Sequence, residues 1–399
     1  MNKNYNYDVV IVGAGPAGST CARHLAENNI KVLVVEKKQE IGTPKRCAEG
    51  LNYRGLKNAG LEPDPRWATS EIQGVSLYSP GEKNIEMKWA GAMGCVLERK
   101  IFEKFLARDA INAGARYMVK TRAIEVLKEN GKISGIKAEF MGKEFNINAK
   151  LVIAADGVES GIAKSAGIKT LNKLTDYISG FQYEMAGLKN YDENLLHVFF
   201  GNEVAPKGYA WIFPKGEGVA NIGIGILGKE SSDKNRAKDY LDKFIEKHPG
   251  IFEDASPIEI NAGGVPVSSA VETFVADNFM IIGDSAQLVN PIHGGGIDIA
   301  MNSAKIAAGV AAEALKEGDL SKEKLYGYEK TWRETTGVKM QKLLRLRMVL
   351  EKLTDNDFEL LADVLSGEDI VKLTVGKFKF LLKLLSKNPR TLLLLRKFI

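Results

Sequence analysis

Residues 8–18, DVVIVGAGPAG, decide the fold of this chain. The apolar run at residues 9–12 is typical of a strand buried on both faces. Pro16 can begin a helix without losing a hydrogen bond, and the free N–H groups at a helix start favour an anion. Gly13, Gly15 and Gly18 follow the spacing G-x-G-x-x-G. In this motif the first glycine allows a tight turn, the second lets a pyrophosphate approach the backbone, and the third lets helix and strand pack closely.

A second apolar run, VLVVEK at residues 32–37, contains Glu36, eighteen residues after Gly18. The carboxylate of Glu36 is placed to accept hydrogen bonds from ribose hydroxyls. A glycine turn that binds no ligand is the alternative. A strand, glycines, a helix and an acidic strand end within one short unit nevertheless predict a dinucleotide-binding site.

The composition is that of a globular protein, with 399 residues, 45% hydrophobic, 26% charged and a net charge of +5. This length is comfortable for two or three domains. The N-terminus runs into the first strand without a signal peptide, and no apolar run of about 18 residues predicts a spanning helix. We therefore expect a cytoplasmic protein that does not span a membrane.

Cysteine and histidine give no sign of a metal site. The three cysteines are odd in number and widely spaced, which indicates neither a disulfide framework nor a zinc site and is natural in a reducing cytosol. The histidines are scattered, so no metal-ligand cluster is expected among His24, His197, His248 and His293.

Residues 37–51, KKQEIGTPKRCAEGL, are rich in glycine, proline and charge and are predicted to form a loop. Cys47 lies in this loop. It is either a small buried residue or a group at the active centre, where the neighbouring Lys45 and Arg46 would favour its thiolate. The residues alone leave both interpretations open.

Further elements are expected before residue 150. Alternation predicts two strands within residues 72–90, and apolar spacing predicts a helix over residues 95–115. Arg99 stands at the start of that helix, where an arginine is most often a solvated charge. Asn130-Gly131 predicts a hairpin turn between two strands.

Two later strand ends are candidate contacts for the same dinucleotide. Residues 120–157 read as strands that end in Asp156-Gly157, which fits a backbone contact but also an ordinary turn. A buried strand ends at Gly283-Asp284, and Asp284 is placed to meet a second sugar-like hydroxyl. The loop NPIHGGG then opens a helix, so the glycines at residues 294–296 are placed to stabilise negative charge; a plain glycine cap is the alternative.

Residues 175–228 alternate between apolar and polar positions, which predicts an antiparallel sheet with one solvent-exposed face. A helix is expected at residues 233–248. The aromatic side chains of the sheet form its core, or some of them line an apolar pocket; they are Phe181, Tyr183, Phe199, Phe200, Tyr209, Trp211 and Phe213.

From about residue 322 the chain is expected to be helical to its end. Residues 370–399 carry Lys and Arg but no Asp or Glu, and their leucines recur at helical spacing. The segment is either an ordinary helix with solvated lysines or a surface that meets anionic lipid.

Three motifs together with Arg99 resemble the FAD-dependent oxidoreductases of the aromatic-hydroxylase type, over roughly residues 7–310. The motifs are Gly13–Glu36, Asp156-Gly157, and Gly283-Asp284 with the glycines after it. Within that group the chain resembles the archaeal geranylgeranyl reductases, which saturate the isoprenoid chains of membrane ether lipids. Four stretches carry the closer resemblance: PKRCAEGL (44–51), VLERKIFEKFL (96–106), KGYAWIFPKGEGVANIGIG (207–225) and GDSAQLVNPIHGGGI (283–297). The flavin halogenases of the superfamily carry W-x-W-x-I-P, whose first tryptophan is Tyr209 here, which argues against halogenation.

The resemblance implies an α/β fold, α+β overall, in three parts. We expect a Rossmann-like FAD-binding domain over residues 1–71, 92–174 and 274–321. An antiparallel-sheet substrate domain is inserted at residues 72–91 and 175–273, and residues 322–399 form a C-terminal helical, basic region. FAD contacts are implied for Gly13, Gly15, Ala17, Gly18, Glu36, Cys47, Ala48, Gly50, Arg99, Ala123, Asp156, Gly157, Asp284, Gly295, Gly296 and Ile297.

The implied reaction adds two hydrogens across each isolated alkene. Reduced flavin would supply hydride, and the helix start after His293 would stabilise negative charge on the reduced ring. The proton donor is open among Cys47, His293 (protonated beside the flavin) and Tyr209. Tyr209, Trp211 and Phe213 are expected to bind the isoprenoid chain.

The implied partners are a geranylgeranylated glycerol phospholipid, a membrane surface and a reduced donor, which is NAD(P)H, a deazaflavin or ferredoxin; no nucleic acid is expected. In this setting the basic tail favours peripheral attachment to the membrane. Two alternatives stay open: a flavin monooxygenase of the same superfamily, and a non-catalytic protein that binds FAD and lipid.

Overall fold

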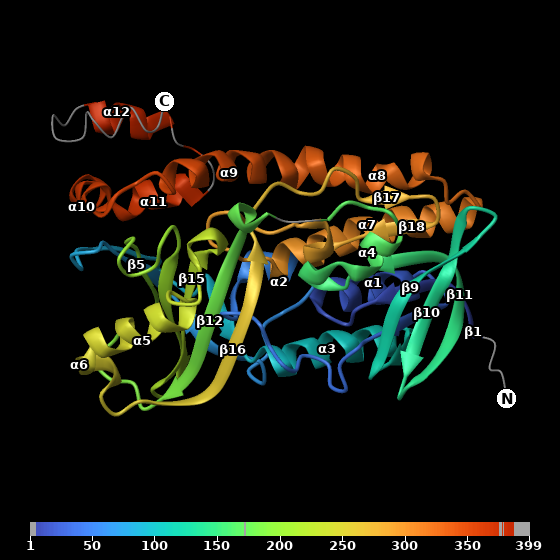
Figure 1. Cartoon of the computed structure of the whole chain (residues 1–399), viewed down its shortest axis with the longest axis horizontal. Coiled ribbons are helices and arrows are strands. Elements are labelled where there is room, and N and C mark those ends of the chain that lie inside the picture. Colours follow the sequence, from blue (N-terminus) through green and yellow to red (C-terminus); the bar gives the residue numbers. More distant parts are fainter. Residues whose placement is uncertain (1–4, 171–172, 375–376, 378, 387–399) are drawn as a thin grey trace.

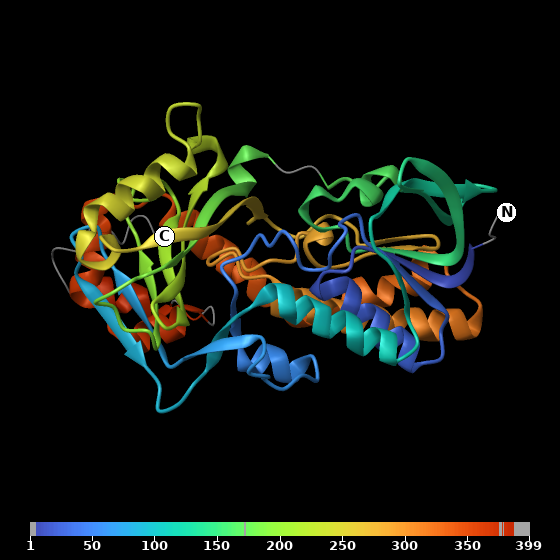
Figure 2. The ribbon, with the colours of Figure 1, turned by 90° about the horizontal axis from the view of Figure 1, so that it is seen from below.

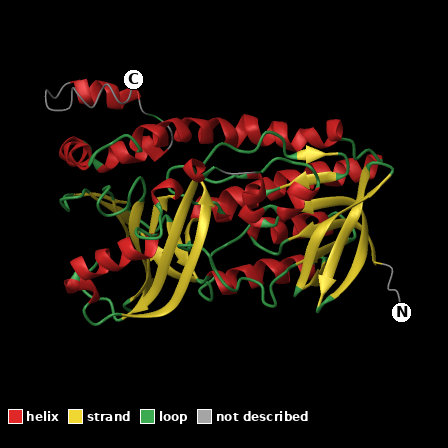
Figure 3. Ribbon diagram, viewed as in Figure 1, coloured by secondary structure: helices red, strands yellow, loops and turns green. Residues whose placement is uncertain are grey.

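The computed structural model describes residues 5–170, 173–374, 377 and 379–386. Two large sheets lie at opposite ends of the molecule, and long helices run between them (Figure 3). The predicted fold class, α/β with an added antiparallel sheet and C-terminal helices, is confirmed.

The first sheet holds the glycine motif. Its order is β17-β18-β11-β1-β2-β8, and the β9–β10 hairpin extends it from β11. β1 is parallel to both β2 and β11, as in a Rossmann-like fold. The strands are β1 (Tyr5–Val12), β2 (Val32–Val35), β8 (Arg116–Met118), β9 (Thr121–Glu129), β10 (Lys132–Phe140), β11 (Lys143–Ala154), β17 (Val275–Ala276) and β18 (Phe279–Ile281).

Helices and the hairpin cover opposite faces of this sheet. Helices α1 (Pro16–Glu27), α3 (Arg99–Asn112) and α7 (Ile297–Glu317) lie on one side of β1, and the β9–β10 hairpin lies on the other (Figure 2). The predicted turn at Asn130 and Gly131 is confirmed, since both residues have positive φ angles, 52° and 81°, as a type I′ turn requires. The buried residues 9–12 of β1 therefore lie between two covered faces.

The second sheet has the order β16-β12-β15-β14-β13-β5-β6. Its neighbours are antiparallel except for β13 and β5, which are parallel. The strands are β5 (Gly74–Tyr78), β6 (Asn84–Lys88), β12 (Tyr177–Ala186), β13 (Leu195–Phe199), β14 (Tyr209–Gly216), β15 (Val219–Leu227) and β16 (Ser256–Pro266).

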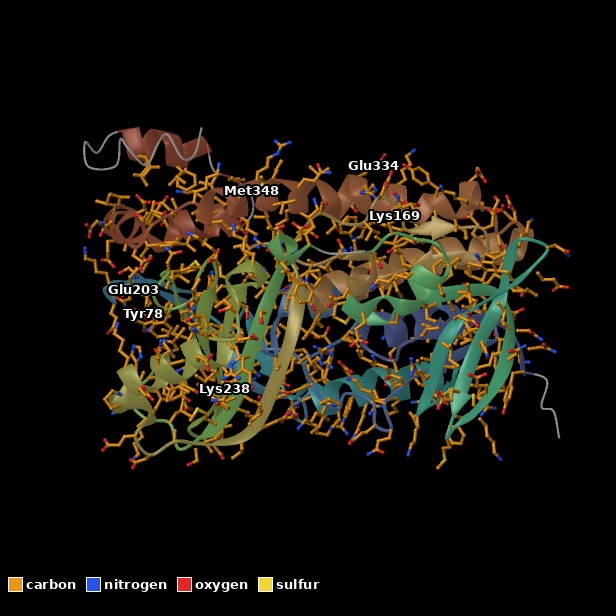
Figure 4. The ribbon with its side chains drawn as sticks, viewed as in Figure 1. Tyr78, Lys169, Glu203, Lys238, Glu334 and Met348 are labelled. Carbon is orange, nitrogen blue, oxygen red and sulfur yellow. The ribbon has the colours of Figure 1, made fainter. Side chains whose placement is uncertain are left out.

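The prediction of one solvent-exposed face is wrong at the centre of this sheet. Helix α5 (Ala237–Lys247) covers one face, under which Tyr183 and Phe199 are buried. Tyr78 stacks on Phe199 at a ring-centroid distance of 4.3 Å; Figure 4 labels Tyr78 and, on α5, Lys238. All of β15 after its first residue is buried, because the loop at residues 45–50 packs against the other face.

A small third sheet links the two large ones, in the order β3-β7-β4. It consists of β3 (Gly50–Asn52), β4 (Ala68–Ile72) and β7 (Gly94–Leu97). Helix α2 (Tyr53–Asn58) follows β3 directly in the sequence. The helix predicted from residue 95 begins only at Arg99. Residues 94–97 are buried and hydrogen-bonded to strands on both sides, so tertiary pairing overrides their helical spacing.

The C-terminal helices run along the molecule from the first sheet towards the second (Figure 1). They are α8 (Lys322–Trp332), a π-helical turn η5 (Arg333–Gly337), α9 (Val338–Leu350), α10 (Asp355–Val364), α11 (Gly367–Thr374) and α12 (Lys379–Ser386). Much of the predicted basic tail, including residues 387–399, lies outside the described residues. Within the described part of the chain, each helix is too short or too polar to cross a membrane. Two further short helices are α4 (Gly161–Ser165) and α6 (Pro249–Phe252).

Candidate active site

The glycine turn after β1 is shaped as its spacing predicts. A Cβ on Gly13, whose φ is +106°, would lie 2.3 Å from the Ala155 carbonyl oxygen, and a Cβ on Gly18 would lie 1.9 Å from the Gly13 carbonyl oxygen. Those two glycines are needed for packing. A Cβ on Gly15 would meet no atom within 4 Å, so open space lies at the start of α1, where an anionic group of a dinucleotide is favoured.

Glu36 holds this turn in place. Its carboxylate accepts hydrogen bonds from the N–H groups of Ala14 and Lys38, each at 2.9 Å, and the residue is buried. A carboxylate oxygen can accept more than one hydrogen bond. Glu36 is therefore placed both to fix the glycine turn and to bind the ribose hydroxyls of the sequence prediction.

The three predicted cofactor motifs meet at the first sheet. Asp156 accepts hydrogen bonds from the Ser285 hydroxyl at 3.0 Å and from the Ile162 N–H at 2.8 Å, and thereby ties the second motif to the third. The third motif also touches the first, since a Cβ on Gly283 would lie 3.0 Å from the Cβ of Ala17. Gly157 follows with a φ of +73° and open space at its Cβ position. Segments more than 120 residues apart thus form one edge of one site.

Asp284 presents a carboxylate to the start of helix α7. Within the described chain no group donates a hydrogen bond to it, and a Cβ on Gly296 would lie 3.1 Å from its Oδ1. Burial raises the pKa of the Asp284 carboxyl, and the Arg99 guanidinium partly offsets that rise. A half-buried acceptor beside a glycine fits a hydroxyl-bearing ligand. Together with the open space at Gly15, it fits FAD lying across this edge.

Arg99 is the cation beside Cys47. Its Nε donates to Glu103 Oε1 at 2.5 Å, its side chain is only 20% exposed, and its guanidinium interacts with the Cys47 thiol. The prediction that Lys45 and Arg46 act on Cys47 is wrong. Lys45 binds Glu49 at 2.8 Å and Arg46 binds Glu159 at 3.3 Å, because carboxylates from the rest of the fold compete for both cations.

Two backbone N–H groups of the glycine loop before α7 donate hydrogen bonds to other atoms of the same loop. Gly294 donates to the Asn290 carbonyl at 2.9 Å, and Gly295 donates to His293 Nδ1 at 3.1 Å. Within the described chain nothing accepts the N–H groups of Gly296 and Ile297. The donors that face negative charge at this helix start are therefore those of Gly296 and Ile297, whereas Gly295 shapes the loop.

The side chains of His293 and Tyr209 are held by this loop. The Tyr209 hydroxyl donates to the His293 carbonyl oxygen at 2.6 Å, and burial raises the pKa of that hydroxyl. Desolvation by the surrounding protein lowers the pKa of the His293 imidazole, with Asp298 opposing the change. His293 Nδ1 is also a hydrogen-bond acceptor, so we infer a neutral ring at pH 7 in place of the protonated one suggested by the sequence.

An aromatic row on β14 faces the Cys47 loop. Tyr209, Trp211 and Phe213 alternate along the strand, with successive ring centroids 5.7 and 6.3 Å apart. A Cβ on Gly50 would lie 3.1 Å from the Phe213 ring. The Trp211 indole N–H donates to Gln182 Oε1 at 3.1 Å, and the Gln182 amide in turn donates to the Cys47 carbonyl at 3.0 Å. The apolar row therefore lies beside the Cys47 loop and the glycine loop before α7.

Like the other predicted FAD contacts, those of Ala48 and Ala123 stay predictions. Ala48 belongs to the Cys47 loop, and its carbonyl accepts a hydrogen bond from Asn221 at 3.2 Å. Ala123 is half-buried in β9 opposite Ala138 on β10. Neither alanine has a side chain that identifies a ligand.

A buried charge cluster behind the Cys47 loop escaped the sequence analysis. Glu49, which is fully buried, accepts hydrogen bonds from Lys45 at 2.8 Å, Lys215 at 3.1 Å and Asn221 at 2.7 Å, and Glu184 binds the same two lysines. The sequence contains one signal of this cluster. Glu184 alternates with the core residue Tyr183 along β12, so its carboxylate had to point to the opposite, covered face of the sheet.

Comparisons with known proteins agree with this geometry. Residues 8–172 match the family described as FAD dependent oxidoreductase, and residues 176–265 match the Geranylgeranyl reductase catalytic domain. The chain is 43% identical to the digeranylgeranylglycerophospholipid reductase of Methanothrix thermoacetophila, covering 98% of both chains. It is also 43% identical to the enzyme of that name from Methanocaldococcus jannaschii, over 97% of this chain and 96% of that one.

Solved structures show the same fold. A geranylgeranyl bacteriochlorophyll reductase-like protein from Thermoplasma acidophilum superposes with a TM-score of 0.90 at 37% identity, over 99% of this chain and 100% of that one. A flavin-dependent brominase reaches 0.73 at 20% identity, over 93% of this chain and 94% of that one, which shows the fold alone. Near-full-length identity above 40%, with both family matches, establishes that the chain is an FAD-dependent oxidoreductase and belongs to the digeranylgeranylglycerophospholipid reductase family.

Proposed function

We propose that this protein saturates the isolated C=C bonds in the geranylgeranyl chains of archaeal ether phospholipids, as a step of membrane lipid biosynthesis. The observation that carries the proposal is the row of Tyr209, Trp211 and Phe213 on β14. An isoprenoid chain is apolar and needs an apolar wall, and this row lies beside the Cys47 loop and the glycine loop before α7. The class of lipid comes from its relatives, which are named digeranylgeranylglycerophospholipid reductases.

Each part of the site has a task in this reaction. Bound FAD, once reduced, supplies the hydride for one carbon of the alkene. The N–H groups of Gly296 and Ile297 stabilise negative charge at the start of α7. The β14 row holds the chain and excludes water. The other carbon takes a proton from Cys47 Sγ, where the Arg99 guanidinium and the Glu49 N–H, 3.1 Å from the sulfur, stabilise the negative charge left behind.

Tyr209 and His293 have supporting tasks in this scheme. The Tyr209 hydroxyl donates its proton to the His293 carbonyl and so fixes the glycine loop against β14. The electrons for each further double bond would come from a reduced donor, which is NAD(P)H, a deazaflavin or ferredoxin. We further propose that the enzyme works on the cytoplasmic face of the membrane, where its lipid substrate resides.

An anaerobic experiment tests the function. The flavin of the FAD-loaded protein is bleached with dithionite, the excess reductant is removed, and a geranylgeranylated glycerophospholipid is added. We expect the flavin absorbance to return as the lipid gains two hydrogens for each double bond, measured by mass spectrometry. Flavin that stays reduced until oxygen is admitted would contradict the proposal and favour a monooxygenase.

Replacing Cys47 by alanine tests the proton donor. We expect turnover to fall by about 10²- to 10⁴-fold, the usual contribution of general acid catalysis, while FAD content and bleaching by dithionite stay normal. Cys21→Ala is the matched control, since Cys21 is buried in α1 and faces the core. Normal turnover by the Cys47 variant would remove the thiol from the mechanism.

A further inference from the structure

Helix α9 presents a basic face to solvent. Val338, Lys342, Arg345 and Met348 are exposed and follow one another at spacings of three or four residues, which places them on one side of the helix. Lys339 is exposed at the edge of this face. The helix has no Asp or Glu in its sequence, VKMQKLLRLRMVL.

The cations of this face lack acidic partners in the described part of the chain. Lys339, Lys342 and Arg345 form no ion pair with a described carboxylate, whereas Arg347, on the buried side, binds Glu351 at 2.6 Å and the Val267 carbonyl at 2.7 Å. The nearest preceding acid is Glu334, in the π-helical turn before α9; Figure 4 labels both Glu334 and Met348. Three cations gathered on a helix that carries no acid give this face a net positive charge, which attracts an anionic partner outside the chain.

The face begins beside the candidate active site. Asn302 of α7 donates a hydrogen bond to Thr336 at 3.2 Å, which ties the turn before α9 to the helix whose first residues face the cofactor edge. Lys339 is close enough to His293 to act on the pKa of its imidazole. A partner bound along α9 would therefore lie next to the glycine loop.

Exposed apolar groups accompany the charges. Val338 is 47% exposed and Met348 is 57% exposed, one at each end of the basic face. Leu174 is 68% exposed on a turn that is linked to α9 through Val267, because the Val267 N–H donates to Asp176 and its carbonyl accepts from Arg347. Basic residues interspersed with exposed apolar ones suit the boundary between lipid headgroups and acyl chains better than a purely polar partner.

We propose that the exposed face of α9, formed by Val338, Lys342, Arg345 and Met348 with Lys339 at its edge, docks on an anionic lipid bilayer. Headgroup phosphates pair with the cations, Val338 and Met348 enter the interfacial layer, and the glycine loop is brought to the membrane surface. This inference rests on the proposed function for its choice of partner, since a phospholipid substrate resides in such a surface.

Vesicle binding tests the face. The FAD-loaded full chain is mixed with vesicles of phosphatidylcholine and phosphatidylglycerol, or with vesicles of phosphatidylcholine alone, and sedimented at low and high salt. We expect binding only to the anionic vesicles, weakened by salt. Lys342→Glu with Arg345→Glu should weaken it by about thirty-fold or more, at about a factor of five for each basic side chain near the surface.

Two matched variants separate docking from general charge and folding effects. Lys128→Glu with Lys132→Glu reverses two exposed lysines on the β9–β10 hairpin and should bind as the parent does. Lys342→Arg with Arg345→Lys keeps the charge and should also bind normally. Parental binding by the Lys342→Glu, Arg345→Glu variant, or binding by the parent that ignores lipid charge and salt, would overturn the proposal.

Turnover separates this inference from the function itself. With substrate dispersed in a nonionic detergent, the parent and the charge-reversed α9 variant should turn over equally, because neither Lys342 nor Arg345 lies in the active site. Absence of that turnover in the parent would refute the proposed function, whereas the vesicle experiment decides the docking face by itself.

Discussion

Replacing Gly15 by valine is expected to abolish FAD binding while the protein still folds. Gly15 has an ordinary extended conformation, with φ of −69°, and no atom lies within 4 Å of its Cβ position. We therefore expect a folding cost of only about 1 kcal/mol, typical of a changed helix cap. The valine side chain would occupy the space at the start of α1 that the FAD pyrophosphate needs, and we expect affinity to fall about a thousandfold, or about 4 kcal/mol.

Flavin absorbance of the purified variant and thermal unfolding without FAD measure the two effects separately. Gly309→Val is the matched control, because Gly309 is exposed on α7 and its Cβ position is also open. That control should keep its flavin. Gly18→Val should instead prevent folding, since its Cβ would collide with the Gly13 carbonyl. A Gly15 variant that purifies with a full complement of FAD would place the pyrophosphate elsewhere.

Replacing Glu49 by alanine is expected to destabilise the protein by about 3–5 kcal/mol, the usual result of removing one partner from a buried ion pair. The Glu49 carboxylate also accepts a hydrogen bond from the backbone N–H of Arg99 at 2.8 Å. This bond adds to those with Lys45, Lys215 and Asn221. The substitution leaves two buried lysines with one carboxylate fewer. It also frees the loop that carries Cys47, so turnover should fall together with stability.

Denaturant unfolding at saturating FAD measures the loss. Glu40→Ala is the control: Glu40 pairs with Lys104, but both side chains are half-exposed, so solvent already screens that pair. Adding Lys215→Met to the Glu49 variant should restore part of the stability, since it removes a cation left without its partner. A loss below about 1 kcal/mol would mean that the cluster acts like a surface ion pair.

The same cluster gives the stability a pH dependence. Although burial alone would raise the pKa of Glu184, the ammonium groups of Lys45 and Lys215 lower it below the ordinary value of 4.5. A carboxyl whose pKa is lowered by folding stabilises the protein above its unfolded pKa. This contribution is therefore complete at neutral pH and is lost as the pH falls below about 4.5 through the lower pKa of the folded state.

Local chemistry made part of this structure predictable. Gly13, Gly15 and Gly18 take their roles from spacing within one turn, and Asn130-Gly131 takes its turn type from the positive φ angles that those residues tolerate. The buried run in β1 and the acidic residue after β2 are equally local. These features placed the cofactor edge without knowledge of the rest of the chain.

Other features depend on partners that are distant in sequence. Residues 94–97 form a strand only because β3 and β4 lie on either side of them. Lys45 points away from Cys47 because Glu184, 139 residues further on, offers it a carboxylate. Arg99 approaches Cys47 because β7 turns directly into α3. Spacing carries no information about such encounters, although a charged residue in a buried strand signals that a partner must exist.

The strand order also sets when the protein can acquire its cofactor. β1 is made first, but its neighbour β11 ends at Ala154, and the β18–α7 segment that borders the same site ends only at Glu317. The β5–β6 pair likewise waits for β13, which pairs with β5, and β6 finally contacts α11 near the end of the chain. The FAD site of a nascent chain therefore cannot be complete before the segment up to α7 has been made, so we expect flavin loading to come late in synthesis.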